Sequence, residues 1–309
     1  MAAMKIGLML SDARGVHDLA AQAKQAEHDG FASCWFNNAG GADAMTSVVV
    51  AAAATARIEL GTGVVPIYTR HPVAMAQQAL AVQSAAGGRF TLGIGLSHQP
   101  AVVNRYGLTW EQPFRYMREY LEVLQNLIDT GRTGFSGEVF NVHSEVGFKG
   151  MAPCPLVLAA LGPSMLALAG ERSAGTMTWV TGPKTLASLT IPKITQAAAR
   201  ASRPAPRIIA GLPVAVTDDA AGARETAARL FERYGQLPSY RAMLDREGVA
   251  TAADVAVVGD EDGVAAQLQH LKEIGVTDFA GTIFPVGPDA RASSERTWAT
   301  LAKLAGKLG

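Results

Sequence analysis

Short apolar runs alternate with longer, alanine-rich amphipathic stretches from one end of this chain to the other. The short runs predict buried strands of a parallel sheet, and the amphipathic stretches predict the helices that connect them. We expect strands at residues 5–10, 33–36, 58–63, 90–94, 156–159, 176–180, 208–216 and 278–283. We expect helices at residues 18–28, 43–54, 72–86, 113–130, 164–173, 219–234, 261–274 and 293–307.

The number of strands separates two fold classes. A (β/α)8 TIM barrel has eight parallel strands with helices between them, whereas an open doubly wound sheet more often has five or six strands. The pattern therefore favours a single α/β barrel domain over residues 1–309, and the open sheet is the alternative.

Two segments exceed what a minimal barrel needs. Residues 131–150 contain Gly-Phe-Ser-Gly-Glu-Val-Phe-Asn-Val, which is typical of a β-hairpin, and residues 235–254 are polar and can form helix. We interpret both as insertions. Loops that follow barrel strands lead to the catalytic face, so an insertion there can cover a substrate.

Charge and composition exclude several classes of protein. The chain has 27 basic and 27 acidic residues, a formal net charge of zero and no long basic block, which argues against a nucleic-acid partner. With 49% hydrophobic residues it can bury a large core. We find no leader-like segment and no apolar run long enough for a membrane helix, so we expect a cytoplasmic protein.

The two cysteines do not indicate a metal site or a disulfide framework. Cys34 and Cys154 lack the CxxC spacing and have no histidine cluster beside them. We expect buried, reduced thiols and no bound metal.

The active site of a barrel is built from the loops that follow its strands, so the candidate site residues are those after each predicted strand. Asn37 and Asn38 follow the second strand, and their amides could bond the carbonyl groups and ring nitrogens of a heterocycle; a simple turn explains them equally well. Gly63 and Val64 follow the third strand, where a glycine allows a flat ring to approach closely.

The fourth strand leads into Gly95, Leu96, Ser97 and His98. Gly93 and Gly95 form a GxG pattern, but no third glycine and no helix follow, so this is not a dinucleotide-binding motif. His98 has a side chain suited to proton transfer near neutral pH, and we regard it as the candidate catalytic residue.

The fifth strand runs directly into a helix and provides a candidate phosphate site. Free N–H groups and the helix dipole at such a helix start favour a phosphate, although an ordinary helix cap has the same sequence features. The loop Thr181-Gly182-Pro183 is a second candidate for phosphate contact. The candidate residues at the helix start are Ala159, Ala160, Leu161, Gly162, Pro163 and Ser164.

At these residues the chain resembles the bacterial luciferase-like superfamily, and within it the branch that uses the deazaflavin coenzyme F420. The resemblance covers nearly the whole chain. Its most specific parts are Gly30-Phe31 to Trp35-Phe36, Gly61-Thr62-Gly63-Val64, Arg70-His71-Pro72, Gly88-Arg89-Phe90-Thr91-Leu92-Gly93-Ile94-Gly95 and Gly275-Val276-Thr277-Asp278-Phe279.

The resemblance implies a barrel whose cofactor ring lies against a bulge at the third strand, with a non-proline cis peptide that would be Gly63-Val64 here. It also implies a phosphate near residues 162–164, and residues 96–98 beside the ring. Members of the superfamily are frequently homodimers and act on small molecules.

Related enzymes that oxidise sugar phosphates have an Asp-His pair where Asn38-Ala39 stands here, and an acid where His98 stands. The resemblance therefore implies a reductase that transfers hydride from C5 of the deazaflavin to a small organic acceptor, with His98 donating a proton to the product. Two alternatives are an FMN-dependent luciferase-like monooxygenase and a flavin-binding barrel without catalytic activity.

Overall fold

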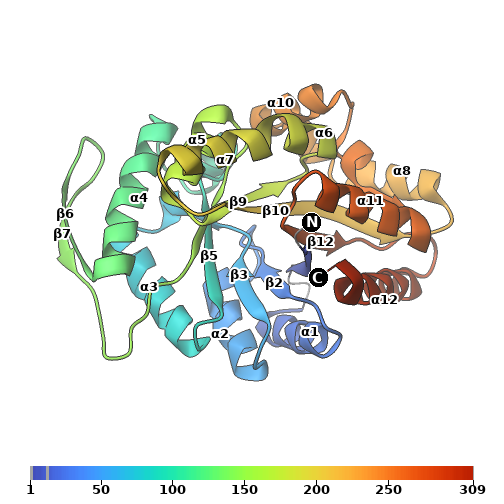
Figure 1. The fold of residues 1–309 in the computed structure, drawn as a ribbon, viewed down its shortest axis with the longest axis horizontal. Coiled ribbons are helices and arrows are strands. Elements are labelled where there is room, and N and C mark those ends of the chain that lie inside the picture. The colour runs from blue at the N-terminus through green and yellow to red at the C-terminus, as the bar shows by residue number, and fades with distance from the viewer. Residues whose placement is uncertain (1–2, 12–13, 309) are drawn as a thin grey trace.

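A computed structural model describes residues 3–11 and 14–308, and eight parallel strands in it close into a barrel (Figure 1). The order around the barrel is β1 (Lys5–Leu10), β2 (Ser33–Phe36), β3 (Glu59–Thr62), β5 (Phe90–Gly95), β8 (Leu156–Ala159), β9 (Gly175–Trp179), β10 (Arg207–Val216) and β12 (Asp278–Ile283). Strand β12 pairs with β1 and closes the ring. The barrel prediction is confirmed, and the open-sheet alternative is wrong.

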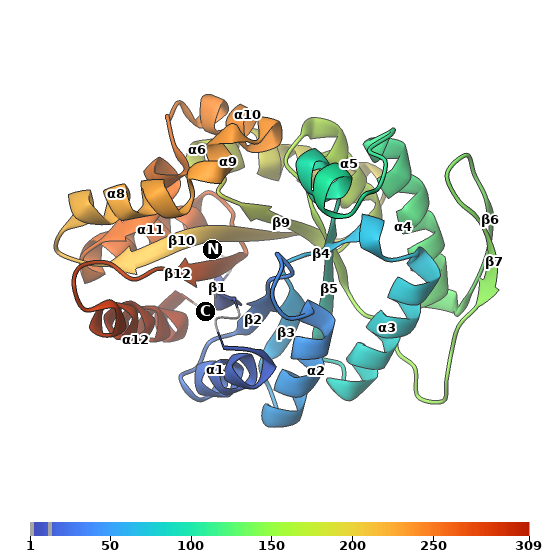
Figure 2. The ribbon, with the colours of Figure 1, turned by 180° about the vertical axis from the view of Figure 1, so that it is seen from behind.

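Helices surround the barrel on its outside (Figures 1 and 2). The predicted helices are found as α1 (Val16–His28), α2 (Ala44–Ala54), α3 (Pro72–Ala85), α4 (Pro113–Thr130), α5 (Pro163–Arg172), α8 (Ala220–Leu230), α11 (Glu261–Glu273) and α12 (Ala290–Leu308). The pattern missed α6 (Pro183–Thr185) and α7 (Ile191–Arg200), and two short strands, β4 (Val65–Pro66) and β11 (Val257–Gly259).

Side chains on each strand alternate between the barrel interior and the surrounding helices. Cys34 and Phe36 belong to the large core between strands and helices, whereas Trp35 between them points inside. The apolar cluster inside the barrel consists of Trp35, Val157, Met177, Ile209 and Ala280. Both cysteines are buried free thiols, as expected.

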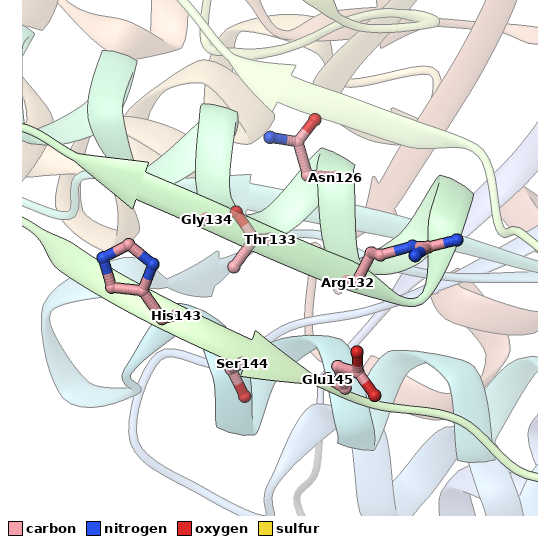
Figure 3. A pocket seen from close by; sticks show the side chains of 7 residues that line it. All are labelled: Asn126, Arg132, Thr133, Gly134, His143, Ser144 and Glu145. Atoms are coloured by element: carbon pink, nitrogen blue, oxygen red, sulfur yellow. The ribbon is translucent and has the colours of Figure 1, made fainter.

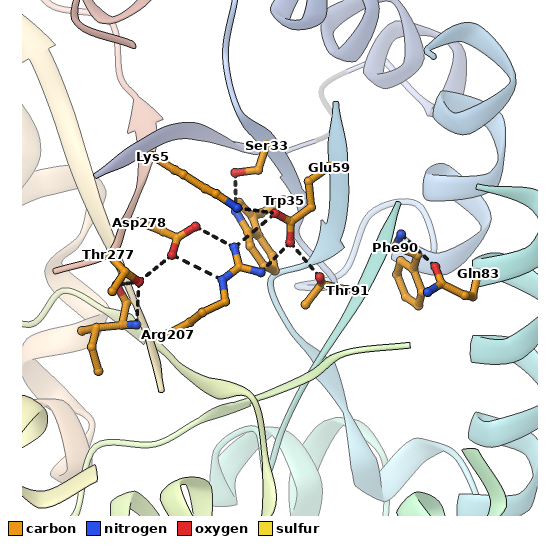
Figure 4. Close-up of polar contacts among 11 residues, drawn as sticks. Lys5, Ser33, Trp35, Glu59, Gln83, Phe90, Thr91, Arg207, Thr277 and Asp278 are labelled. Carbon is orange, nitrogen blue, oxygen red and sulfur yellow. Dashed lines mark hydrogen bonds and ion pairs between the residues drawn. The ribbon is translucent and has the colours of Figure 1, made fainter. Parts of the chain in front are cut away.

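A buried charged cluster fills the barrel at the beginnings of its strands (Figure 4). The guanidinium of Arg207 donates to Glu59 Oε1 and to Asp278 Oδ1, each at 2.6 Å, and lies 5.7 Å from the Trp35 ring centroid. Burial alone would raise the pKa of Glu59, but the hydrogen bonds and charge of Arg207 and a bond from Thr91 hold that pKa below its usual range. This end of a barrel serves stability rather than catalysis.

Both predicted insertions form regular structure. Residues 131–150 contain the expected hairpin of β6 (Arg132–Ser136) and β7 (Asn141–Glu145), which packs against α4 on the outside of the barrel (Figure 2). Glu119 of α4 fixes the hairpin by accepting backbone N–H bonds from Val139 at 2.8 Å and Phe140 at 3.1 Å. The second insertion contains α9 (Glu232–Gln236), which begins just before it, and α10 (Pro238–Glu247).

Candidate functional site

The carboxyl ends of four neighbouring strands gather the residues expected from the sequence. Because β2, β3, β5 and β8 are consecutive around the barrel, the loops that follow them lie along one half of its mouth. These loops, with the last residues of β5 and β8, contain Asn38, Gly63, Val64, Gly95, Leu96, Ser97, His98 and residues 159–164. The structure thus brings all the predicted site residues to the same side of the barrel.

A one-residue bulge interrupts the third strand at Gly63 and Val64. Gly61 pairs with Thr91, but Val65 pairs with Ile94, so the register between the strands shifts by one residue. The Thr62 hydroxyl replaces the backbone hydrogen bonds that the bulge interrupts. It donates to Gly93 O at 2.7 Å and accepts from Gly93 N at 2.8 Å. The peptide bond Gly63-Val64 is cis, as the resemblance implied.

Small side chains form a flat apolar surface beside this bulge. A Cβ atom at Gly95 would lie 2.9 Å from Val64 Cγ2 and 3.1 Å from Ala159 Cβ, so the three residues touch only because residue 95 is a glycine. We call Val64, Gly95 and Ala159 the ring floor. Val64 and Ala159 are partly exposed, which leaves this surface open for a planar group.

His98 lies at the end of β5, between the ring floor and the second insertion. Its ring centroid is 5.5 Å from that of Tyr240 of α10, and its carbonyl accepts a bond from Val102 N at 2.9 Å. Burial lowers the pKa of His98 below its ordinary 6.5, and the charge of Arg233 lowers it further. The imidazole is therefore mainly neutral at pH 7, and its protonated form is a stronger acid than an exposed imidazolium.

Two residues other than glycine have a left-handed backbone conformation at the mouth. Ser97 follows β5 with a φ of 66°, and Val180 follows β9 with a φ of 50°. Left-handed backbone is costly for a non-glycine residue, above all for β-branched valine, and such residues cluster at functional sites. Their location at two strand ends supports the mouth as the candidate active site.

Helix α5 provides an open N-terminus next to the ring floor. No side chain caps it, and the N–H groups of Ser164 and Met165 have no hydrogen-bond partner within the described part of the chain. A Cβ atom at Gly162 would meet nothing within 4 Å, so the space above this helix end is free. Free N–H groups at a helix start suit a phosphate.

The prediction that loop 181–183 contacts a phosphate is wrong, because the carboxylate of Glu247 already binds the free N–H groups that follow this loop. Glu247 of α10 accepts hydrogen bonds from Lys184 N at 3.0 Å and Thr185 N at 2.7 Å at the start of α6. A Cβ atom at Gly182 would lie 2.3 Å from the same carboxylate carbon. The loop 181–183 is thus used to hold α10 and presents negative charge.

The two asparagines after β2 serve the turn, as one of the two interpretations had it. The side-chain oxygen of Asn37 accepts from Ala39 N, and that of Asn38 accepts from Ala44 N at 3.0 Å. The side-chain NH2 group of Asn38 has no partner among the described residues, so it can still donate to a ligand. Asn37 is partly buried, and its turn bond occupies its oxygen.

Two aromatic walls at the mouth were not expected from the sequence. On one side Tyr68 stacks on Trp110 at 5.3 Å and on Tyr116 at 4.3 Å, between ring centroids. On the other side Trp179 meets Phe231 at 5.9 Å and Tyr234 at 5.8 Å. Trp179 is the last residue of β9 and the last but one of the strand predicted at 176–180, so its position near a strand end could have indicated it. The other aromatic residues showed no sequence signal that distinguishes them from core residues.

Of two surface hollows, one lies away from the mouth and the other lies beside the candidate phosphate site at the start of α5. One, of about 500 Å³, lies between the hairpin and the end of α4 (Figure 3). Helices in a barrel run opposite to the strands, so the end of α4 is on the stability side and this hollow is remote from the candidate site. The other, of about 310 Å³, lies beside the α5 N-terminus between Ser164 and Lys193.

Neither a metal centre nor a membrane span is found within residues 3–11 and 14–308. No three histidine, cysteine, aspartate or glutamate side chains there are grouped to hold a metal ion. None of the helices described has both the length and the apolar character required to cross a bilayer.

Comparison with known proteins agrees with this geometry. The family model described as luciferase-like monooxygenase matches residues 1–278. The chain is 27% identical to 5,10-methylenetetrahydromethanopterin reductase from Methanolobus tindarius, over 93% of this chain and 96% of the relative.

Two solved structures share the fold. An F420-dependent secondary alcohol dehydrogenase in complex with an F420-acetone adduct superposes with a TM-score of 0.80 at 22% identity, over 97% of this chain and 98% of the other. The coenzyme F420-dependent tetrahydromethanopterin reductase from Methanopyrus kandleri superposes with a TM-score of 0.79 at 22% identity, over the full length of both chains. At this identity the likeness establishes the barrel.

Proposed function

Since the chain belongs to the luciferase-like monooxygenase family, we propose that it is a coenzyme F420-dependent oxidoreductase that works as a reductase on a small organic acceptor. The observation that carries the proposal is the pairing of the ring floor with the open N-terminus of α5. A flat apolar surface next to free N–H groups matches a cofactor with a planar ring and a phosphate. The relatives named as F420-dependent enzymes support this choice of cofactor.

The residues present can hold such a cofactor. Val64, Gly95 and Ala159 would support the ring from below, and the Asn38 NH2 group is free to donate to a ring oxygen or nitrogen. Ser164 and its neighbour at the start of α5 would bind the phosphate through backbone N–H groups. When bound, F420 supplies hydride from C5 to the acceptor.

His98 is the residue we propose for proton transfer. Its burial and the nearby Arg233 keep its pKa low, so its protonated form gives up a proton readily to an anionic product. The Asn38-Ala39 pair and the absence of an acid at position 98 support a reductase over a sugar-phosphate dehydrogenase. We further propose that the whole chain is one domain that acts as a homodimer.

An FMN-dependent monooxygenase is the second candidate, because the family model carries that description and FMN also combines a planar ring with a phosphate. A flavin-binding barrel without catalytic activity is the third. Two assays separate them. In the first, without oxygen, the protein is mixed with chemically reduced F420 and a panel of unsaturated carbonyl, imine and nitroaromatic acceptors. In the second, reduced FMN and oxygen replace F420.

The proposed function predicts that the absorbance of oxidised F420 returns in an enzyme-dependent manner with at least one acceptor class. Turnover with reduced FMN and oxygen, and none with reduced F420, would establish the monooxygenase instead. No turnover under either condition would support the barrel without catalytic activity.

A further inference from the structure

In the half of the barrel mouth formed by β9, β10 and β12, two hydrogen-bonding side chains are buried without a partner. The Nε1–H group of Trp179, at the end of β9, and the hydroxyl of Thr282, near the end of β12, have no hydrogen-bond partner among the described residues. Buried polar groups in folded proteins are nearly always paired. Two unpaired groups at a catalytic mouth therefore indicate contacts that a ligand completes.

Both side chains lie on the inner face of the barrel. Trp179 follows Met177 by two residues and Thr282 follows Ala280 by two, and both earlier residues belong to the interior cluster. A Cβ atom at Gly211 would lie 3.2 Å from Trp179 Cε3. The indole therefore extends across the inner face of β10, which lies between β9 and β12.

The two groups lie two strands apart on the inner face of the barrel. Trp179 pairs with Gly211 and Thr282 pairs with Pro213, so the two residues are two strands and two positions apart. With usual strand spacing and rise their Cα atoms are roughly 11 Å apart. The tryptophan side chain occupies part of this distance, and both polar atoms are covered by protein, so a ligand reaches them only when the segment over them moves aside.

Short helix α9 and the turn before it cover this place. The rings of Phe231 and Tyr234 stand edge-on to Trp179, and Tyr234 also meets Tyr240 at 5.0 Å. No residue within α9 is buried, so moving this short helix aside would break these ring contacts but expose little core surface. The aromatic rings would then close over the face of a planar ligand.

Charge in this half of the mouth favours a neutral ligand. Arg233 is the cation beside the aromatic wall, and its guanidinium already donates to Tyr234 Oη at 2.8 Å and lies 4.8 Å from that ring's centroid. The walls themselves are aromatic or small. The groups left to bind a ligand are one indole N–H and one hydroxyl, which together suit a carbonyl oxygen.

We propose that Trp179, Gly211 and Thr282, covered by Phe231 and Tyr234, form an acceptor pocket that selects a neutral, planar molecule through its carbonyl oxygen. This inference rests on the proposed function, because the ring floor is on the opposite half of the mouth and leaves this half to the molecule that receives hydride. Trp179 and Thr282 are specificity residues of the pocket rather than groups that take part in proton transfer.

Calorimetric titration of the F420-saturated protein with two probes tests the pocket. Coumarin is a neutral planar bicycle with one carbonyl, and chromene is its counterpart without the carbonyl. We expect coumarin to bind about tenfold more tightly than chromene, which is the usual effect of one hydrogen bond. In Trp179→Phe and in Thr282→Val that preference should largely disappear, with chromene affinity unchanged.

Matched controls make the result specific. Trp298→Phe removes an indole N–H that bonds Asp29 on the outside of the barrel, and Thr282→Ser keeps the hydroxyl, so both should retain the preference for coumarin. Equal affinity for both probes, or a preference that survives Trp179→Phe and Thr282→Val, would overturn the acceptor pocket. F420 affinity is measured first on every variant, and its absence in the unaltered protein would refute the proposed function instead.

Discussion

Val64 and residue 95 touch so closely that a Cβ atom at position 95 would lie 2.9 Å from Val64 Cγ2. The same atom would lie 3.1 Å from the Cβ of Ala159 on the next strand. The flat ring floor thus depends on one glycine in β5 that holds a bulged loop and a neighbouring strand together. This relationship links the interrupted third strand to cofactor binding.

Gly95→Ala should separate Val64 from Ala159 and disturb the ring floor. We expect F420 affinity to fall about tenfold or more, with a loss of about 1–3 kcal/mol in the free energy of unfolding from overpacking. Fluorescence titration and urea denaturation measure the two effects. The control is Gly306→Ala in α12, where a Cβ atom meets open space and should leave F420 affinity unchanged. Unaltered F420 affinity in Gly95→Ala would mean that the ring binds elsewhere.

Ser164→Asp tests the phosphate site at α5. A carboxylate in the first turn is favourable for the helix dipole by about 0.3–1 kcal/mol, so the protein should not be destabilised. The same charge should repel the phosphate and weaken F420 binding about tenfold, and added salt should reduce the effect. Ser164→Asn, which is neutral and of similar size, is the control. Equal F420 affinity in both variants would exclude this helix end as the phosphate site.

The pH dependence of turnover tests His98. Because burial and Arg233 lower its pKa, the protonated form accumulates only below pH 6.5, and kcat/KM for an acceptor should rise as pH falls through that lowered pKa. His98→Asn should remove this rise and lower the rate roughly 100-fold. His71→Asn is the control, since His71 caps α3 at the surface and asparagine can cap it as well. A rise retained in His98→Asn would assign the proton to another group.

Arg207→Met tests the charged cluster at the opposite end of the barrel. Loss of the guanidinium leaves Asp278 without a cation and Glu59 with only Lys5, 3.7 Å away, which should cost about 3–5 kcal/mol of stability at pH 7. Urea denaturation measures this, with the surface variant Arg296→Met as a control that should lose about 1 kcal/mol or less. F420 affinity of the folded variant should be unchanged. Full stability of Arg207→Met would show that the ion pairs contribute nothing.

The same variant has a defined pH dependence. In the unaltered protein the pKa of Glu59 is below its ordinary 4.5, so the stability from its ion pair is present above that pH and is lost as pH falls through the lower value. Without Arg207 this carboxyl loses the strongest of the interactions that lower its pKa, so its pKa is higher in the variant than in the unaltered protein. Lowering the pH then protonates Glu59 in the variant first and removes the charge that Arg207 no longer pairs. The difference in the free energy of unfolding between the two proteins should therefore narrow as pH is lowered from 7 toward 4.5.

Most of the barrel could be predicted because its strands are continuous apolar runs bounded by turn residues. Strands β1, β2, β8 and β12 have the predicted bounds. The third strand does not, because an apolar pattern cannot reveal that the Thr62 hydroxyl replaces ladder bonds to Gly93. The cis bond that follows was expected from the resemblance alone and is present.

Helix α7 was missed because its sequence is locally unfavourable for a helix. It contains the β-branched residues Ile191, Ile194 and Thr195, which lower helix propensity. Tertiary packing compensates, since a Cβ atom at Gly170 of α5 would lie 2.4 Å from the carbonyl oxygen of Ile194. This close approach of two helices depends on residues far apart in the sequence, which periodicity does not detect.

The site was predictable where it follows from strand ends and not where it depends on distant segments. The expectation that barrel active sites follow the strand ends identified Gly95, His98 and the start of α5, because each comes shortly after a predicted strand. It could not show that Glu247 fills the loop at Gly182, or that Phe231 approaches Trp179, since those partners are about 50 to 65 residues away in the chain.

The most direct measurement is a titration of the purified protein with F420 and, separately, with FMN, each followed by fluorescence quenching. We predict saturable, tight binding of F420 and much weaker binding of FMN. Tighter binding of FMN than of F420 would contradict the proposed deazaflavin reductase and identify an oxygen-using flavin enzyme, and failure to bind either would contradict a cofactor site on the ring floor.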